Sequence, residues 1–163
     1  MTTFIKAEDK KAYGLIAKLA STIWKEHYSP IIGSDQVAYM LNKFQSAEAI
    51  ASQVNQGIQY YLIFHNSKAA GYLAFEKQHS ELFLSKIYVS KDMRGKGIGK
   101  AAMEFVVREG QYMDCKQISL TVNKQNTGSI KAYEKLGFHN QGGIVQDIGK
   151  GYVMDDFLLI KPL

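Results

Sequence analysis

Three strand-like runs between residues 60 and 90 constrain the fold of this chain more than any other feature. The runs read YYLIFHN (60–66), AAGYLAFEK (69–77) and ELFLSKIYVS (81–90), and they are rich in β-branched and aromatic residues. Only two or three polar residues separate one run from the next, and links that short join antiparallel neighbours. The sequence therefore predicts an antiparallel meander at the centre of the fold.

Helical patterns come before the meander. Apolar residues at helical spacing predict a first helix over residues 9–27. Ser29-Pro30 should end it, because the residue before a proline avoids the helical region. Ser34 is a candidate cap for a second helix, and the helical pattern continues over residues 46–54.

Strands and helices alternate after the meander. A helix that follows residue 90 and leads to another strand is a crossover, so the strands on either side of it should lie parallel or nearly so. Gly137 suits the left-handed position that ends a helix. This order predicts an α/β (α+β) fold with a mixed, mostly antiparallel central sheet flanked by helices. The other expected elements are a first strand in TFIKA (3–7), a helix opened by the glycine-rich stretch 93–100, a strand at 117–123, a helix at 126–136, and strands at about 138–148 and 152–161.

Composition and charge limit the classes of function. The chain has 163 residues and only two prolines, so residues 1–163 are expected to form a single domain. No apolar run approaches the roughly 20 residues of a membrane span, and no signal peptide is evident. With one cysteine, Cys115, this predicts a cytoplasmic protein without membrane contact. A net charge of +5 favours an anionic partner, but the aromatic pattern of single-strand binders is missing, so no nucleic-acid partner is expected. No metal site is expected either.

The stretch MRGKGIGK (93–100) places three glycines and three cations between a strand and a helix. It lacks the spacing of a P-loop, and it begins too far after the strand for a dinucleotide-binding fold. N–H groups at a helix start bind phosphate, and glycines let a pyrophosphate approach the main chain. A simple glycine-rich turn is the alternative. The predicted phosphate-binding residues are Arg94, Gly95, Lys96, Gly97, Ile98, Gly99 and Lys100.

Two motifs resemble those of the GNAT superfamily of N-acetyltransferases. Arg94-x-x-Gly97-x-Gly99 is similar to its coenzyme A signature, (Q/R)-x-x-G-x-(G/A). NTGSIKAYEKLGF (126–138) is similar to its segment N-x-x-(A/S)-x-x-x-Y-x-x-x-G-F, and the order of elements is that of the family over nearly the whole chain. The resemblance implies the acyl-CoA N-acyltransferase fold and acetyl-CoA as the acetyl donor.

The second motif places three side chains on one helix face. Asn126, Ser129 and Tyr133 are three and four positions apart, so they share a face. Acetyl transfer from a thioester expels a thiolate, and a phenol can return the proton. Tyr133 is therefore the candidate general acid, with simple packing as the alternative. All three residues are predicted to contact coenzyme A, and the resemblance adds the main chain of Ile87, Tyr88 and Val89 for the pantetheine amides.

The acceptor amine must lose a proton before it attacks, because an alkylammonium with a pKa of about 10.4 is charged at neutral pH. Glu81 is the first candidate base, with His79 and Glu76 beside it. The end of the first helix and the tail DIGKGYVMDDF resemble a bacterial subgroup that includes polyamine acetyltransferases. The predicted acceptor-binding residues are Trp24, His27, Tyr28 and Asp155.

Three functions fit the sequence. The first is transfer of an acetyl group from acetyl-CoA to a small primary amine such as a polyamine. The second is acetylation of a protein N-terminus or lysine, and the third is a non-catalytic module that binds coenzyme A. Because Asp155 and Asp156 are adjacent on a strand, they must point to opposite faces. A homodimer is also expected, because domains of this kind often pair.

Overall fold

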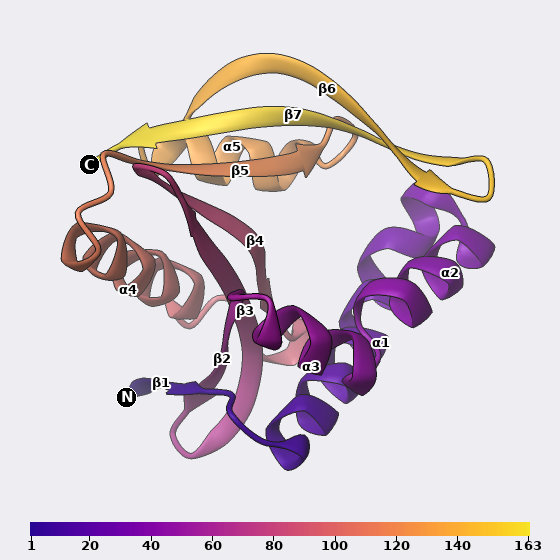
Figure 1. Cartoon of the computed structure of the whole chain (residues 1–163), viewed down its shortest axis with the longest axis horizontal. Helices are drawn as coiled ribbons and strands as arrows, with labels where there is room; N and C mark the ends of the chain where they lie inside the picture. Colours follow the sequence, from indigo (N-terminus) through magenta and orange to yellow (C-terminus); the bar gives the residue numbers. More distant parts are fainter. The chain divides into compact units, whose positions relative to one another are not determined.

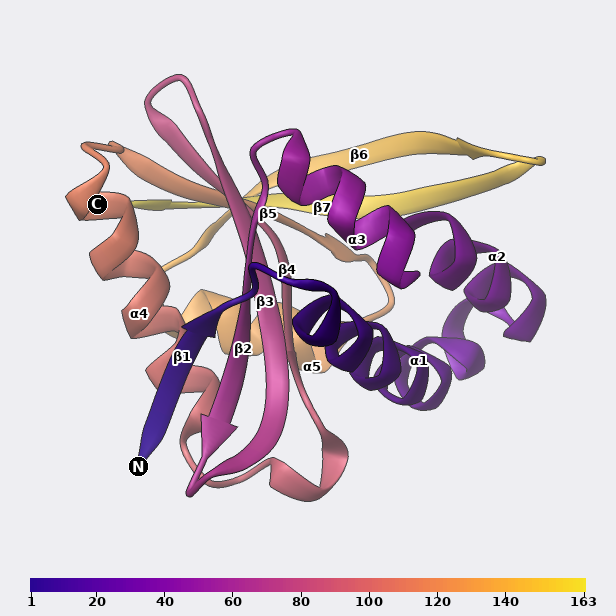
Figure 2. The ribbon, with the colours of Figure 1, turned by 60° about the horizontal axis from the view of Figure 1, so that its bottom comes forward.

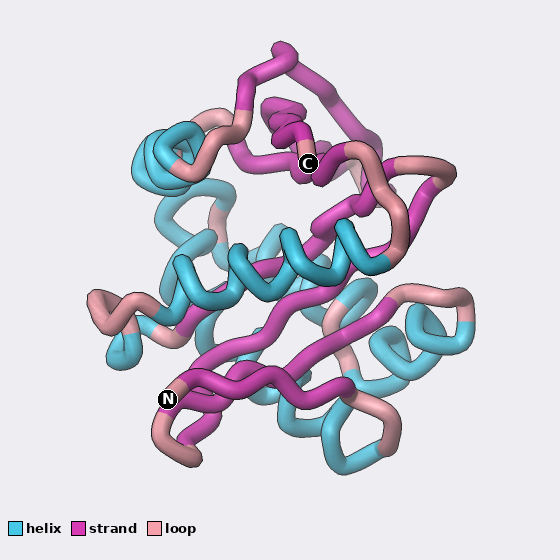
Figure 3. The backbone as a smooth tube through the Cα atoms, turned by 90° about the vertical axis from the view of Figure 1, so that its left-hand side faces the viewer, coloured by secondary structure: helices cyan, strands magenta, loops and turns pink.

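The computed structural model describes residues 1–163, the whole chain. Helices and strands make up most of it, and short loops join them (Figure 1 and Figure 3). The strands are β1 (Thr2–Lys6), β2 (Gln59–His65), β3 (Lys68–Gln78), β4 (Glu81–Val89), β5 (Gln117–Asn123), β6 (His139–Gly149) and β7 (Tyr152–Pro162). The helices are α1 (Lys10–Ile32), α2 (Ser34–Phe44), α3 (Ala47–Asn55), the short 3-10 helix η1 (Lys91–Met93), α4 (Ile98–Tyr112) and α5 (Thr127–Lys135).

The strands are hydrogen-bonded in the order β1-β2-β3-β4-β5-β7-β6. β4 and β5 run parallel, whereas β1 with β2, β2 with β3, β5 with β7, and β6 with β7 run antiparallel. Helix α4 connects the two parallel strands, as a crossover requires. The structure thus confirms the predicted α/β fold with a mixed, mostly antiparallel sheet.

The chain forms two compact units, each made of two segments. Unit 1 comprises Met1–Glu76 and Lys86–Val106, and unit 2 comprises Lys77–Ser85 and Val107–Leu163. β3, β4 and α4 therefore each pass from one unit into the other. The expectation of one domain over residues 1–163 stays a prediction.

The sheet of unit 1 carries helices on both faces. Tyr61 pairs in register with Leu73, which neighbours Tyr72, so Tyr61 and Tyr72 point to opposite faces. The Phe105 ring of α4 stacks on Phe4 of β1 with centroids 4.4 Å apart, and it meets the Tyr61 ring edge-on at 4.9 Å. Helix α4 thus covers the Tyr61 face, while α1, α2 and α3 lie grouped together beside the strands (Figure 2).

A buried polar network attaches α2 and α3 to the strands. The Tyr72 hydroxyl donates to Gln45 Oε1 at 2.6 Å, and Gln45 Nε2 donates to the Tyr60 hydroxyl at 3.0 Å. Tyr60 in turn donates to Gln53 Oε1 at 2.6 Å. Burial raises the pKa of Tyr60 to about 12, so its phenol stays protonated and able to donate. Every member has a partner, which is the condition under which a buried polar network stabilises a fold.

Unit 2 is built around β5, all of whose residues, Gln117–Asn123, pair with β7. Leu120 and its partner Leu159 are 2% and 0% exposed, and they mark the covered face of these strands. Lys161 shares that face with Leu159, and its ammonium donates to the Leu136 carbonyl at the end of α5 at 2.8 Å. Helix α5 therefore lies on this face, and β6 and β7 form a long curved hairpin beside it (Figure 1).

Helix α1 ends later than the sequence predicted. It continues through Ser29 and Pro30 to Ile32, so the predicted end at Ser29-Pro30 is wrong. A proline this close to the helix end removes a single hydrogen bond, which the rest of the helix tolerates. The stop comes from Gly33, which has φ +88° and donates its N–H to the Ser29 carbonyl at 3.0 Å.

No helix of the chain is both long and apolar enough to cross a membrane.

The segment after α1 forms two helices with separate caps. Ser34 is the first residue of α2 and makes no capping hydrogen bond with its side chain, so the predicted cap is wrong. Gln45 has a non-helical φ of −130° and ends α2. Ser46 then caps α3 by accepting a hydrogen bond from the Ala49 N–H at 3.1 Å. This break leaves the Gln45 side chain available for the buried network.

Candidate active site

The predicted phosphate-binding residues form the turn before α4, in unit 1. Gly95 and Gly97 have φ values of +78° and +76°, which other residues rarely adopt. The Ala101 N–H donates to the Gly97 carbonyl at 3.1 Å, at the start of the helix. The N–H groups of residues 98–100 precede this bond, so the α-helix leaves them without i−4 partners. With the positive end of the helix dipole behind them, these groups suit an anion.

Gly99 is a glycine that the fold itself does not require. Its φ is outside the left-handed region, and a Cβ built at this position would have no atom within 4 Å. Alanine would fit there and would favour the helix by roughly 1 kcal/mol. A bare main chain at an exposed helix start is what the close approach of a pyrophosphate needs.

Cations and an apolar anchor complete this turn. Arg94 Nε donates to the Val89 carbonyl at 3.2 Å, which ties the turn to the end of β4. Ile98 is 1% exposed and holds the turn against the core. Lys96 and Lys100 are exposed. The seven predicted residues are thus gathered in one turn, which presents positive charge and N–H groups together.

The end of β4 departs from regular pairing. The ladder between β4 and β5 ends at Phe83 and Ser119, so residues 87–89 lie beyond it. A Cβ built on Gly71 of β3 would lie 2.0 Å from the Tyr88 carbonyl oxygen. No side chain larger than hydrogen fits so close to a backbone oxygen, so Gly71 is required for the path that β4 takes at this point.

Five aromatic side chains of unit 1 form a cluster that we term the aromatic wall: Trp24, His27 and Tyr28 of α1, Tyr72 of β3 and Tyr88 of β4. The Tyr28 and Tyr88 hydroxyls share a hydrogen bond at 3.1 Å. Trp24 is 3% exposed and meets both rings edge-on, at 5.6 and 5.7 Å, so it supports the wall from behind. Burial raises the pKa of Tyr72 well above its ordinary value, and the nearby Trp24 indole N–H opposes this shift, although it makes no hydrogen bond of good geometry.

His27, a member of the aromatic wall, lies near enough to Arg94 of the predicted phosphate-binding turn for its pKa to respond to that charge. Burial lowers the pKa of His27, and the positive charge of Arg94 lowers it further. Both effects favour the neutral imidazole at neutral pH. His27, a predicted acceptor-binding residue, and Arg94, a predicted phosphate ligand, therefore interact electrostatically within unit 1.

Helix α5 carries the second motif, in unit 2. Asn126 caps the helix by accepting a hydrogen bond from the Ser129 N–H at 3.4 Å. Gly137 has φ +98°, which confirms the predicted left-handed stop, and the Phe138 N–H returns to the Tyr133 carbonyl at 3.1 Å. The Tyr133 ring packs edge-on against Phe138 with centroids 5.7 Å apart. Both ends of this short helix are therefore held, and so is the phenol near its end.

Glu81 lies at the start of β4, in unit 2. Its Oε1 accepts a hydrogen bond from Gln117 Nε2 and its Oε2 accepts one from the Ser119 hydroxyl, both at 2.6 Å. These bonds tie β4 to β5 and give each carboxylate oxygen a partner. The role of Glu81 as a general base stays a prediction.

Asp155 and Asp156 differ in burial and in the partners of their carboxylates. Asp155 is exposed, and its carboxylate pairs with the Lys124 ammonium at 2.8 Å. Asp156 is 2% exposed, and its Oδ1 has no hydrogen-bond partner. Burial raises the pKa of Asp156 to about 6 and Asp155 adds to the shift, while the hydrogen bond with Thr121 and the charge of Lys124 oppose it. Sequence reasoning chose Asp155 for the acceptor site and passed over Asp156.

The chain matches the model of the acetyltransferase (GNAT) family over residues 19–138. That range contains the phosphate-binding turn, the end of β4 and the motif on α5. The chain belongs to the GNAT acetyltransferase family. The resemblance seen in the two sequence motifs is therefore confirmed.

Curated relatives show that GNAT proteins similar to this one differ in their acceptors. A probable spermine N(1)-acetyltransferase of Bacillus subtilis subsp. natto is 25% identical over 68 residues, which cover 41% of this chain and 45% of the relative. A ribosomal-protein alanine N-acetyltransferase of Escherichia coli is 30% identical over 87 residues, which cover 52% of this chain and 59% of the relative. The chain thus matches about half the length of these relatives.

A solved GNAT structure shares the fold over the full chain. PaiA N-acetyltransferase from Thermoplasma acidophilum, in complex with coenzyme A, superposes with a TM-score of 0.81 at 20% identity and covers 100% of this chain and 99% of that one. At this identity the likeness shows the fold alone.

The structure of this chain brings some of the predicted site residues together and adds others. In unit 1 it places Arg94 in the predicted phosphate-binding turn and near His27, and in unit 2 it places Ser129 and Tyr133 on one short helix that Asn126 caps. The sequence contained a signal for Gly71, since an isolated glycine within a strand marks a close approach of another backbone. It gave none for the burial of Asp156. No group of three or more His, Cys, Asp or Glu side chains could hold a metal ion.

Proposed function

We propose that this protein transfers the acetyl group of acetyl-CoA to a primary amine of a small molecule such as a polyamine. The observation that carries the proposal is the turn at 94–100, where free N–H groups, cations and a glycine that the fold does not need meet at a helix start. Membership of the GNAT family and the coenzyme A bound to a protein of the same fold support it.

Recognition of coenzyme A would start at this turn. The N–H groups of residues 98–100 would bind the pyrophosphate, and the side chains of Arg94, Lys96 and Lys100 would balance its charge. The main chain of residues 87–89 lies beyond the ladder with β5, so these amide groups would bond the pantetheine arm. Asn126 and Ser129 of unit 2 stay coenzyme A ligands predicted from the sequence motif alone.

Acetyl-CoA supplies an activated thioester. The neutral amine would attack the carbonyl carbon, so that a C–N bond forms, the C–S bond breaks, and an amide and the free thiol of coenzyme A result. Tyr133 would donate its phenol proton to the departing sulfur and recover one from the reacting nitrogen or from water. The cap at Gly137 and the contact with Phe138 hold the Tyr133 ring in place for this transfer.

The aromatic wall supports an amine as the acceptor. Aromatic faces attract organic cations by roughly 0.5–2 kcal/mol each, more where water is excluded. Tyr28 and Tyr88 present two rings 6.2 Å apart at a steep angle, with His27 beside them. Because burial and Arg94 favour neutral His27, the wall gains no positive charge that would repel a polyamine.

A protein amine is the second candidate acceptor. The Escherichia coli relative that acts on a ribosomal-protein alanine has the higher identity of the two curated relatives, 30% against 25%. An N-terminal amine has a pKa of about 7.7–8.0, so it would need less help from a base than a polyamine does.

The deciding experiment measures release of the coenzyme A thiol from acetyl-CoA in the presence of spermidine, spermine, a peptide that begins with alanine, or a lysine-containing peptide. We expect release that depends on spermidine or spermine. Release with a peptide alone would establish the second candidate. Tight binding of coenzyme A without turnover of any amine would indicate a non-catalytic module, and no binding of coenzyme A would contradict the proposal altogether.

A cytoplasmic, reducing setting is part of the same proposal. It is supported by Cys115, the single cysteine, which is free and buried. Burial raises the pKa of the Cys115 thiol, which makes the thiol a poor nucleophile and leaves direct transfer to the amine as the simpler route. Homodimer formation and the lack of a nucleic-acid partner stay predictions.

A further inference from the structure

Asp156 is the side chain whose surroundings the fold of unit 2 explains least. It is 2% exposed, and its Oδ1 makes no hydrogen bond. Buried carboxylates are almost always paired or hydrogen-bonded, because an unpartnered polar group costs roughly 1–3 kcal/mol and a charged one more. A residue that weakens the fold in this way is best explained by a ligand that completes its hydrogen bonds.

The position of Asp156 in unit 2 suits such a ligand. It pairs in register with Asn123, the last residue of β5, and α5 begins only a few residues later. Asp156 and Lys161 are five positions apart on β7, so Asp156 points away from the face that α5 covers. Strand register and alternation place Phe83 of β4 and Met154 of β7 on the same side as Asp156.

We propose that Asp156 receives the acceptor amine: its free oxygen binds the substrate ammonium and takes one proton from it. This inference rests on the acetyl transfer proposed above and names the group that the reaction requires. The step balances, because the ammonium and the carboxylate become a neutral amine and a carboxylic acid. The amine then attacks the thioester, and the proton on Asp156 leaves to solvent as the net proton that acetylation of an ammonium releases.

The surroundings of Asp156 make it a better base than an ordinary aspartate. Its carboxylate faces Thr121 across the ladder with β5, Lys124 after β5, and its own neighbour Asp155, while β6 opposes it with the apolar Ile144. Burial raises the pKa of Asp156 to about 6, which strengthens the carboxylate as a base while leaving it ionised at neutral pH. Glu81 lacks this combination, because both of its oxygens already accept hydrogen bonds.

The first test replaces Asp156 by Asn, which keeps the shape and removes the charge. With spermidine, we expect kcat/KM for the amine to fall by roughly 10²–10⁴-fold, while KM for acetyl-CoA changes by less than about twofold. Glu104→Gln, an equal loss of charge at an exposed site on α4, is the matched control and should keep wild-type kinetics. Wild-type kcat/KM in a folded Asp156→Asn protein, or a large loss in Glu81→Gln alone, would overturn the proposal.

A second variant keeps the carboxylate in place. Thr121→Val removes the hydrogen bond that lowers the pKa of Asp156, so the acidic limb of the kcat/KM profile for spermidine should move to higher pH. A structural role for Asp156 would not move that limb, so an unmoved limb in an active Thr121→Val protein would contradict the proposal.

Binding separates this inference from the proposed function. Calorimetry with spermidine and coenzyme A tests the amine contact without turnover, and Asp156→Asn should weaken spermidine binding by roughly tenfold or more. If wild type binds spermidine through Asp156 but never releases thiol from acetyl-CoA, acetyl transfer fails and the amine site stands. If thiol release is fast in wild type and Asp156→Asn alike, the amine site fails and acetyl transfer stands.

Discussion

Two carboxylates lie beside the two ends of β5, and their hydrogen bonding differs. At the amino end, Glu81 lies beside Gln117 and has a hydrogen bond at 2.6 Å on each oxygen. At the carboxyl end, Asp156 lies beside Asn123 with one oxygen buried and unpartnered. A carboxylate whose oxygens are both bonded serves to hold strands together. One with a free buried oxygen weakens the fold, and such costs collect at functional sites.

This difference between Glu81 and Asp156 supports the proposal that the chemistry of unit 2 takes place at the carboxyl end of β5. Helix α5, with Asn126 and Tyr133, also begins from that end. Ligands of open α/β sheets bind outside the carboxyl ends of parallel strands, and β5 is one of the two parallel strands here. The amino end, with Glu81, is then expected to contribute stability, and variants at the two ends should differ accordingly.

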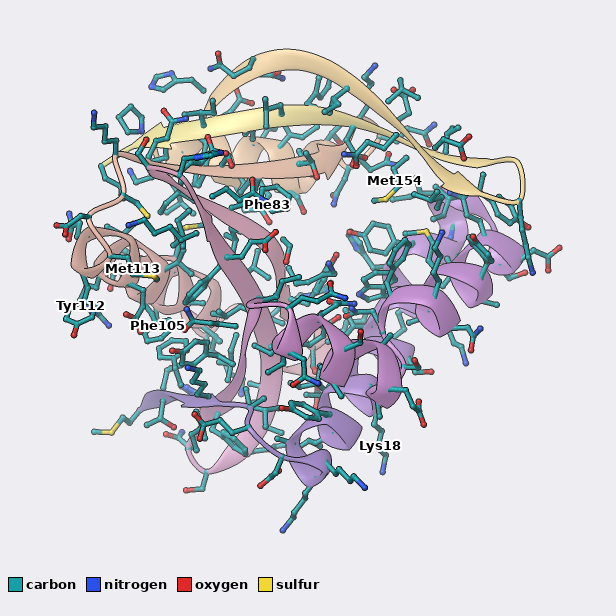
Figure 4. The ribbon with its side chains drawn as sticks, viewed as in Figure 1. Lys18, Phe83, Phe105, Tyr112, Met113 and Met154 are labelled. Atoms are coloured by element: carbon teal, nitrogen blue, oxygen red, sulfur yellow. The ribbon has the colours of Figure 1, made fainter.

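The largest effect is expected from Tyr133 at the catalytic end. Tyr133→Phe keeps the ring and its contact with Phe138 but removes the proton, so kcat should fall by roughly 10–10⁴-fold with little change in coenzyme A affinity. Tyr112→Phe is the matched control, because Tyr112 is 85% exposed at the end of α4 and points outward (Figure 4). Steady-state kinetics check both variants. A wild-type kcat in Tyr133→Phe, where chemistry limits the rate, would make Tyr133 a packing residue.

The next effect concerns stability and separates the two carboxylates directly. The folded pKa of Asp156, about 6, lies above the ordinary value of 3.8, so folding favours its protonated form. The stability that this provides is complete below about pH 4 and is lost as the pH rises through about 6. Asp156→Asn should therefore raise the free energy of unfolding at pH 8 by up to roughly 3 kcal/mol, and the gain should vanish near pH 4.

Glu81→Gln should act in the opposite direction. It weakens the hydrogen bonds from Gln117 and Ser119, so the free energy of unfolding should fall by roughly 1–3 kcal/mol. Urea denaturation at pH 4 and pH 8 measures both variants. Destabilisation by Asp156→Asn at pH 8 would mean that Asp156 has a structural partner, and the contrast between the two ends would be lost.

Gly99 extends the contrast to unit 1, because the proposed binding of coenzyme A requires a glycine there and the fold does not. Gly99→Ala should weaken coenzyme A binding by roughly tenfold, because a methyl group stands where the pyrophosphate approaches the main chain. The melting temperature should stay the same or rise, because a Cβ there meets no atom within 4 Å. Gly14→Ala, at an exposed position in α1 that is equally open, should stabilise without changing affinity. Unchanged affinity in Gly99→Ala would remove the turn from the binding site.

The smallest effect is a pKa shift at His27. Burial lowers the pKa of His27 and the charge of Arg94 lowers it further, so Arg94→Gln should raise that pKa. Coenzyme A should raise it too, since its pyrophosphate would neutralise Arg94. NMR titration of the imidazole protons measures both shifts. If neither change moved His27, the phosphate-binding turn and the aromatic wall would be independent.

The sequence predicted those features that local patterns determine. The meander follows from alternating strands and short turns, the end of α5 from Gly137, and the turn at 94–100 from the clustering of glycines with cations. The predicted end of α1 at Pro30 was wrong, because the rule for the residue before proline does not say how close to the helix end a proline is tolerated. The helix ends instead at Gly33.

Features that depend on tertiary burial were out of reach. Alternation along β7 showed that Asp155 and Asp156 face opposite ways, but which of them is buried depends on packing by residues far away in the chain. Gln45 likewise reads as an ordinary polar residue, yet it is 2% exposed and bonded to two tyrosines. The structure is therefore needed to decide which of two adjacent strand residues is a candidate for binding.

The central claim, that the acceptor amine binds at the carboxyl end of β5, is tested most directly by NMR of the side-chain carboxyl carbons. Protein with ¹³C-labelled Asp and Glu would be titrated with acid and then, at neutral pH with coenzyme A present, with spermidine. The account predicts that Asp156 titrates near pH 6 and that spermidine shifts its resonance while leaving that of Glu81 in place. A spermidine-dependent shift at Glu81, with Asp156 unmoved, would contradict it.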